Sequence, residues 1–396
     1  MDLICLVALI LEAMALRSPP PAPVATSEAP RRAETPCESH STAGSSRPWG
    51  PELDLEEYVA DRLNSAWDCE FCDAFALPTP DRREAWRDAG RCIGQAPAAG
   101  LLLPPPLPGT RALQLIDRPT GHRYLVFEDS PPAGHGLQIF DATPQTELIV
   151  HIPHALDEAM VGREFGVHLL RETSARALLI STSDRRASPA PSPCDAAEPA
   201  RHQASDAAHS PLTRAHALLA GLLEVRPRGI LLELHGNAHP DCPGIFVSDG
   251  AIQPGPISPV LSIRDALQRA TPFPVYSADN DQACPYLGQD SALGRLANRA
   301  PAPCAGPPPA VSSGRFLQIE MDRASRSAGP RPLARALREV FRLPRMPRVE
   351  TMKAAAAPIH VSPPRSPMAA EPRRTSAGNR PRGESGVQKR QVTKDQ

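Results

Sequence analysis

The sequence predicts an α/β fold in which a mixed central sheet is flanked by helices. From residue 147 onward, apolar runs of strand length alternate with runs whose apolar residues have helical spacing. The strand-like runs lack the regular alternation of a half-exposed strand, so both of their faces are expected to be covered. Residues 112–129 instead form two runs of period two around a short turn, which predicts an antiparallel hairpin and hence a mixed sheet.

The individual elements follow from the spacing of apolar residues. The first helix is expected at residues 51–67, where a proline and several acids precede apolar residues at helical spacing. Further helices are expected at residues 81–92, 158–172, 211–225, 260–270 and 332–342. Strands are expected at residues 112–118, 122–129, 147–152, 176–182, 229–234 and 315–321.

The composition limits the packed part of the chain to one domain. Of the 396 residues, 49 are proline and only 4% are aromatic, and the prolines concentrate toward both ends. A leader followed by a disordered Pro/Ser/Ala linker is expected at residues 1–50, and a disordered basic tail at residues 346–396. A single α/β domain is expected at residues 51–345.

Charge and hydropathy argue against two classes of partner. The formal net charge of -1 does not suit a surface built to bind nucleic acid. No segment reaches the roughly 18 uninterrupted apolar residues that span a bilayer. The apolar N-terminus resembles a signal-peptide core, but Asp2 stands where basic residues are usual and Glu12 interrupts the apolar run. A cytoplasmic location is therefore favoured slightly over export, while the oligomeric state does not follow from the sequence.

The cysteines indicate disulfides or free thiols rather than structural zinc. There are nine, and removal of a leader containing Cys5 would leave an even number, which suits disulfides outside the cytosol. Cys69 and Cys72 are followed by Cys92, but no fourth zinc ligand lies nearby in the sequence.

Polar residues able to bind metal or activate water follow the expected strands. Ligands of open α/β sheets sit at the carboxyl ends of the strands. A histidine and a nearby carboxylate, joined by a distant second histidine, commonly hold catalytic zinc with one position left for water. A separate carboxylate can take the proton of that water, and an arginine can bind a substrate carboxylate. The residues at these strand ends are His154, Asp157, Glu158, Asp184, Arg185, Arg186, His235 and Glu320.

The order of the motifs "PHA…E", "SDRR", "ELHG" and "LQIEMDR" resembles the N-formylglutamate amidohydrolase-like families of the metallocarboxypeptidase-type superfamily. The similarity runs from about residue 124 to residue 341 and matches the motif order of uncharacterised bacterial relatives. It implies a zinc carboxypeptidase-like fold. It also implies Zn²⁺ bound by His154, Glu158 and His235. Glu320 would be the general base, and Arg185 would bind a substrate carboxylate or an oxyanion.

Several assignments stay open at the level of sequence. Asp157 competes with Glu158 as the carboxylate ligand, and Arg186 is the alternative to Arg185. "SDRR" departs from the relatives, which have histidine in place of Asp184. His209 in "SDAAHSP" either lines the cleft or caps the helix that begins near Pro211. His239 is a reserve candidate for a metal ligand, because Gly236 and Pro240 predict a loop around it. Glu164 could be a ligand only if the chain has a short insertion after Glu158. His151 lies inside its strand and is interpreted as structural.

These residues favour a zinc-dependent hydrolase of an amide or peptide bond near a free carboxylate. Its substrate would be a small molecule or peptide that carries a carboxylate. The alternative is a non-catalytic relative of the same fold that acts as a binding or interaction module. A serine hydrolase is disfavoured because no Gly-x-Ser-x-Gly turn is present. The two main alternatives differ in whether the donor atoms of His154, Glu158 and His235 converge to within about 4 Å of one point.

Overall fold

The computed structural model describes residues 50–67, 75–95, 107, 109–158, 161–195, 201–252, 255–278, 284, 287–300, 302–304 and 307–343. The predicted leader and linker, except residue 50, and the predicted basic tail lie outside these residues, as do Cys69 and Cys72. The proposed domain boundaries therefore stay predictions. None of the described helices is both long and apolar enough to cross a bilayer.

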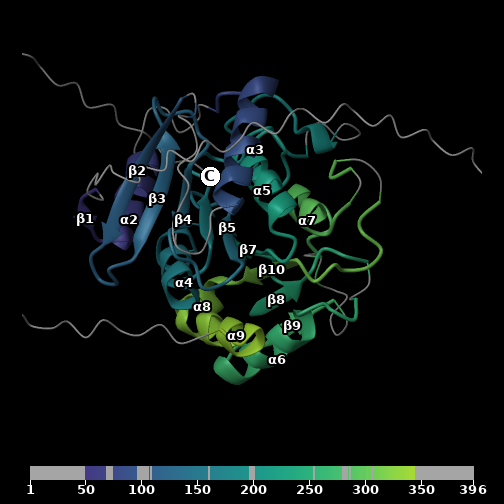
Figure 1. The fold of residues 1–396 in the computed structure, drawn as a ribbon. Helices are drawn as coiled ribbons and strands as arrows, with labels where there is room; N and C mark the ends of the chain where they lie inside the picture. Colours follow the sequence, from purple (N-terminus) through teal and green to yellow (C-terminus); the bar gives the residue numbers. More distant parts are fainter. Residues whose placement is uncertain are drawn as a thin grey trace, which may run out of the picture. The chain divides into compact units, whose positions relative to one another are not determined.

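A mixed sheet of ten strands forms the centre of the fold (Figure 1). Its strand order is β1-β2-β3-β4-β6-β5-β7-β10-β8-β9, and the four neighbours β6, β5, β7 and β10 are parallel. The predicted fold class, a mixed sheet flanked by helices, is confirmed. The strands are β1 Glu52–Leu53, β2 Thr110–Asp117, β3 Arg123–Asp129, β4 Leu137–Asp141, β5 Leu148–Ile152, β6 Ala177–Ile180, β7 Ile230–Gly236, β8 Ile245–Ser248, β9 Val275–Ser277 and β10 Phe316–Met321.

Helices cover both faces of the sheet, as the continuous apolar runs of the parallel strands require. Successive strand residues point to opposite faces, so Val150 packs in one core cluster with α2, α4, α6 and α9, whereas Ile149 packs in the other with α3, α5 and α7. The helices are α2 Leu55–Trp67, α3 Pro80–Gln95, α4 Gly166–Thr173, α5 Arg214–Val225, α6 Val260–Ala270, α7 Ala292–Ala297, α8 Arg323–Arg326 and α9 Arg331–Phe341.

The expected elements recur with a few differences. The predicted hairpin is the antiparallel pair β2–β3. The next strand, β4, is antiparallel to β6 and so connects the hairpin to the edge of the parallel core. The single helix expected at residues 158–172 is instead a π-helical turn, Val161–Phe165, followed by the shorter α4. A π-turn accommodates an extra residue within a helical path, so the backbone winds more widely here than the predicted helix would. The strands β1, β4, β8 and β9 and the short helices α7 and α8 were not predicted, and β1 occupies residues that were expected to begin the first helix.

Candidate metal centre

One face of the parallel core changes from apolar to polar along its strands. Ile149, Leu231 and Phe316 are paired side by side at the start of β5, β7 and β10, within the core cluster under α3, α5 and α7. Because side chains return to the same face every second residue, the following rows occupy the same face. Those rows are His151, Glu233 and Gln318, and then His235 and Glu320. The register of the sheet thus places acids and histidines side by side at the carboxyl ends of these strands.

The turn after β5 contributes His154 and Glu158 to the same place. The backbone N–H of Glu158 donates to the carbonyl of His154 at 2.9 Å, a helical turn that puts both side chains on one side. Glu158 Oε1 lies 3.6 Å from His154 Nδ1 and 4.0 Å from His235 Nδ1. The structure therefore brings together the three residues predicted to hold metal, with one donor atom of each within 4.8 Å of the others.

Each of these two imidazoles is held by a buried carboxylate through its other nitrogen. His154 Nε2 lies 3.1 Å from Asp206 Oδ1, and His235 Nε2 lies 3.1 Å from Glu233 Oε1. Histidines that bind metal are usually oriented in this way, with one nitrogen on the ion and the other donating to an acid. Asp206 and Glu233 did not emerge from the sequence analysis; a glutamate within the apolar strand "ILLELHG" was the one signal that could have identified Glu233.

The unpaired nitrogen of His154 tests whether these residues fit a metal. Among the described residues, His154 Nδ1 is buried and has no hydrogen-bond partner. A buried polar atom without a partner is costly unless a ligand pairs with it. Zinc ligands at about 2.0–2.1 Å from the ion are roughly 3.4 Å apart in a tetrahedral site, so the separations of 3.6 Å and 4.0 Å from Glu158 Oε1 to the two histidines need only small contractions. Two imidazoles and a carboxylate fit Zn²⁺.

The structure distinguishes Glu158 from its competitor Asp157. Glu158 faces the two histidines, and its Oε2 accepts a 2.6 Å hydrogen bond from the backbone N–H of Gly236. A Cβ at Gly236 would clash with Arg326 and approach the Glu158 side chain, so glycine allows this contact. Asp157 instead forms an ion pair with Arg185 at 3.1 Å. Of the two acids, only Glu158 belongs to the candidate centre.

Glu320 lies beside the centre on β10, in register with His235. Its side chain is buried, and its Oε1 accepts a 2.7 Å hydrogen bond from Gln318 Nε2. Burial raises the pKa of Glu320; the charge of His235 opposes this shift and that of Glu158 adds to it. A carboxyl group with a raised pKa takes up a proton more readily than an ordinary glutamate, which suits a group that accepts and returns protons.

The two candidate arginines border a polar cavity of about 360 Å³. Asp206, which contacts His154, lies in the same wall, so the cavity adjoins the candidate centre. Arg185 is held by Asp157, whereas Arg186 is exposed and its guanidinium has no partner among the described residues. The cavity is lined by Arg185, Arg186, Arg201, His202, Gln203, Asp206 and His209.

The remaining candidates are also placed. His209 lines the cavity and does not cap α5, because Thr213 is the N-cap and accepts the backbone N–H of His216. His239 is partly exposed near Asp241, apart from the cluster. Glu164 is exposed on the π-helical turn. His151 is fully buried, its Nδ1 lies 3.0 Å from Glu233 Oε2, and its Nε2 has no hydrogen-bond partner among the described residues.

Comparisons with known proteins give only remote matches. A scan against protein-family models finds no match, and neither does a search of curated proteins. Among solved structures, the chain is similar to N-formylglutamate amidohydrolase from Ralstonia eutropha JMP134 at 16% identity, with 50% of this chain and 94% of that chain covered and a TM-score of 0.29. The chain is also similar to a bacteriophage poly-gamma-glutamate hydrolase at 14% identity and to a structure described as "YNDL-apo (Zinc-free)" at 15% identity. Each of these two matches covers 50% of this chain and 85% of the other chain, with a TM-score of 0.29. At this distance the matches carry no argument about chemistry.

Proposed function

We propose that the chain is a zinc-dependent hydrolase that cleaves an amide or peptide bond. The observation that supports this most is the convergence of His154, Glu158 and His235, with an unpaired imidazole nitrogen and two acids that hold the imidazoles. The buried Glu320 beside them adds a proton acceptor, which a purely structural metal site does not need.

Each residue has a separate task in this proposal. His154, Glu158 and His235 hold the ion, while Asp206 and Glu233 fix the ring orientations. Bound zinc would lower the pKa of water and polarise the scissile carbonyl. Glu320 takes a proton from the attacking water and returns it to the leaving nitrogen, a role for which its raised pKa is suited.

The substrate is a small molecule or peptide with a free carboxylate near the scissile bond. Arg185 and Arg186 line the cavity next to the centre, and a guanidinium can bind a carboxylate through two parallel hydrogen bonds. The ion pair with Asp157 engages Nε of Arg185, which leaves its terminal nitrogens for the substrate. Arg186 has its whole guanidinium available.

The test compares zinc content and hydrolysis for the wild type and two variants. Zinc is measured on dialysed protein by elemental analysis, and hydrolysis on a panel of N-acyl amino acids and short peptides. His235→Ala is expected to lose one equivalent of zinc and all activity. Glu320→Gln is expected to keep the zinc and lose activity by about 10²–10⁴-fold, because it can no longer accept a proton.

Two outcomes would contradict the proposal. A folded wild type that fails to bind zinc at this centre would remove the metal assignment. A wild type that binds zinc but hydrolyses nothing faster than Glu320→Gln does would favour the binding module instead.

A further inference from the structure

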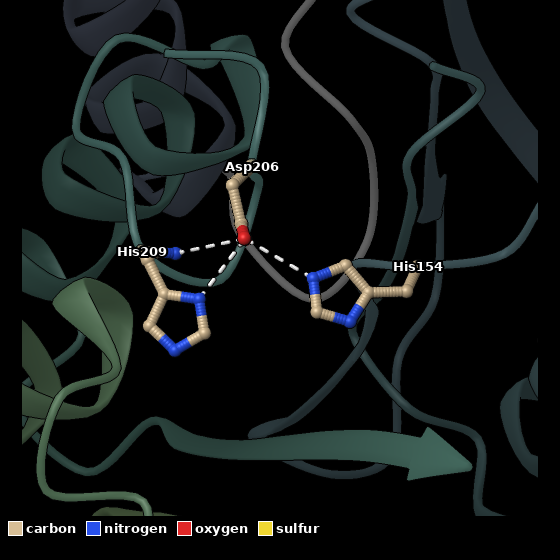
Figure 2. A group of neighbouring side chains, drawn as sticks. All are labelled: His154, Asp206 and His209. Atoms are coloured by element: carbon tan, nitrogen blue, oxygen red, sulfur yellow. Dashed lines mark hydrogen bonds and ion pairs between the residues drawn. The ribbon is translucent and has the colours of Figure 1, made fainter. Parts of the chain in front are cut away.

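We propose a second site for a divalent transition-metal ion, formed by His202, His209 and Asp290 and hereafter called the outer site. It shares no ligand with the candidate metal centre and goes beyond the proposed hydrolase function. The two sites are joined through Asp206, which contacts His154 on one side and His209 on the other (Figure 2).

The donor atoms of the outer site already lie close together. One ligand atom from each of His202, His209 and Asp290 lies within 4.8 Å of the others. His209 Nε2 is 3.6 Å from Asp290 Oδ1, too far for a hydrogen bond but close to the separation of two ligands on one zinc ion. His154 Nδ1 and Glu158 Oε1 are separated by the same 3.6 Å at the candidate metal centre.

Asp206 orients His209 as it orients His154. Asp206 Oδ1 lies 3.1 Å from His209 Nδ1 and also accepts a hydrogen bond from the backbone N–H of His209 at 3.3 Å (Figure 2). With Nδ1 directed at Asp206, Nε2 is left to face Asp290. An imidazole held by a carboxylate through one nitrogen and free at the other is the usual arrangement of a metal-binding histidine.

The segments that carry the three ligands are tied to one another. Ser192 donates its Oγ–H to the carbonyl of His209 at 2.7 Å and its backbone N–H to the carbonyl of His202 at 2.9 Å. Two residues after Asp290, the backbone N–H of Ala292 donates to the carbonyl of Ala208 at 2.8 Å. The disulfide Cys194–Cys304 joins the chain two residues after Ser192 to a position beyond α7, which follows Asp290. The backbone segments that carry the ligands are therefore held together before any ion arrives, which reduces the ordering that binding requires.

The local charges accommodate a cation. Asp206 and Asp290 supply two negative charges next to the ligands, and Arg201 offsets one of them through a 2.5 Å contact with Asp290 Oδ2. That contact leaves Oδ1 for the ion, and the Arg201 side chain is 53% exposed, so its charge is well solvated. Arg185 and Arg186 line the same cavity, and the charge of Arg185 is offset by Asp157. The rings of His202 and His209 stack at 3.8 Å and 4°. The in-plane lone pairs of two parallel stacked rings do not converge on one point, so the His202 ring must turn about its side-chain bonds for both imidazoles to bind one ion.

The ligand set identifies the class of ion. Two imidazoles and a carboxylate suit Zn²⁺ and its transition-metal neighbours, whereas Mg²⁺ and Ca²⁺ prefer oxygen ligands alone. His202 and His209 line the cavity of about 360 Å³, which gives the ion an entry path and room for a water or anion as fourth ligand.

The experiment is a zinc titration of the metal-stripped full chain, followed by calorimetry and elemental analysis. The wild type is expected to bind two equivalents. His202→Ala and Asp290→Asn are each expected to weaken the outer site at least 10-fold while the candidate metal centre still binds its own equivalent. His239→Ala is the matched control, because His239 is also a partly exposed histidine near an aspartate and should change neither site.

The outcomes separate this inference from the proposed function. His235→Ala should remove only the equivalent at the candidate metal centre, so loss of one site leaves the other to be measured. The outer site is disproved if His202→Ala and Asp290→Asn, both folded by circular dichroism, bind zinc as the wild type does. It is equally disproved if His239→Ala shows the same loss, or if the cavity binds inorganic phosphate while the second zinc equivalent is absent.

Discussion

Two buried acids each hold a pair of histidines in this fold. Glu233 lies between His151 and His235, and Asp206 lies between His154 and His209. Burial would raise the pKa of Glu233, but the hydrogen bonds from its two imidazoles lower it overall, and the pKa of Asp206 is lowered in the same way by the charges of its own pair. Both acids therefore stay ionised and act as fixed acceptors, which determines the nitrogen that each ring presents elsewhere.

The substitution Asp206→Asn tests this orienting role. An amide can still accept a hydrogen bond but carries no charge, so we expect zinc affinity at the candidate metal centre to fall by about 10–100-fold. Competition with a chromogenic chelator measures the change. Asp157→Asn is the matched control, because Asp157 precedes the ligand Glu158 but contacts Arg185 instead. Equal affinities for Asp206→Asn and the wild type would show that Asp206 does not support the site.

Two buried histidines should make the protein sensitive to mild acid. Burial lowers the pKa of His135 and of His216 to about 4. Asp129 opposes the shift at His135 and Arg214 adds to it, while Arg87 and His151 add to it at His216. The unfolded chain takes up these protons near pH 6.5 and the folded chain only near pH 4, so the free energy of unfolding falls as the pH drops through that range.

The variant His216→Leu isolates one of these protons. At pH 4 each histidine should account for about 3 kcal/mol of lost stability, at 1.36 kcal/mol for each pKa unit. Urea unfolding at a series of pH values should therefore give the variant a shallower decline than the wild type. Parallel curves for the two proteins would mean that His216 is protonated equally in the folded and unfolded chains.

At the scale of elements, the sequence is informative where strands are apolar throughout. The parallel strands β5, β6, β7 and β10 were predicted because continuous apolar runs are typical of strands buried on both faces. Their polar ends also indicated His154, His235 and Glu320. The strands β8 and β9 were missed because they are only 4 and 3 residues long and depend on pairing with neighbours.

The candidate site was predictable only in part for a similar reason. Residues that follow strands can be identified by position along the chain, whereas Asp206 lies in an irregular segment and reaches His154 only through the fold. The choice between Asp157 and Glu158 required the helical turn after β5, which adjacent positions in a sequence do not reveal.

The two disulfides should differ in their contributions to stability and to metal binding. Cys194–Cys304 closes a separation of 110 residues and Cys242–Cys284 one of 42. Loop-closure entropy then predicts that loss of the first costs about 0.9 kcal/mol more than loss of the second. We expect Cys194→Ser/Cys304→Ser also to weaken zinc binding at the outer site, since Cys194 follows closely after Ser192, which hydrogen-bonds to the backbone of His202 and of His209.

The double variant Cys242→Ser/Cys284→Ser serves as the control for chemical denaturation and zinc titration. It should be destabilised but retain the outer site. Loss of zinc from both double variants to the same extent would assign the effect to general destabilisation.

At the scale of the whole molecule, four carboxylates are buried around the candidate metal centre: Asp206, Glu233 and Glu320, with Glu158 nearly so. Such a concentration of acid opposes folding unless cations or protons compensate it. An ion that binds only the folded chain stabilises it by mass action.

Zinc should therefore raise the melting temperature of the protein. With free zinc at 100 times the dissociation constant, the gain is about 2.7 kcal/mol, or roughly 5–10 °C for a domain of this size. Differential scanning fluorimetry of metal-stripped protein measures it. His235→Ala should show a smaller shift than the wild type at the same zinc concentration. A shift of the same size in both proteins would place the stabilising ion elsewhere.

The single oxygen Oδ1 of Asp206 has a thermodynamic consequence, because it serves both His154 and His209. A metal ion on His209 makes its ring N–H a stronger donor, so this oxygen has less negative charge to offer His154. Two dications linked by one carboxylate also repel each other. The two sites should thus be negatively coupled. Linkage makes that coupling reciprocal: each ion lowers the affinity of the other by the same factor, whichever binds first.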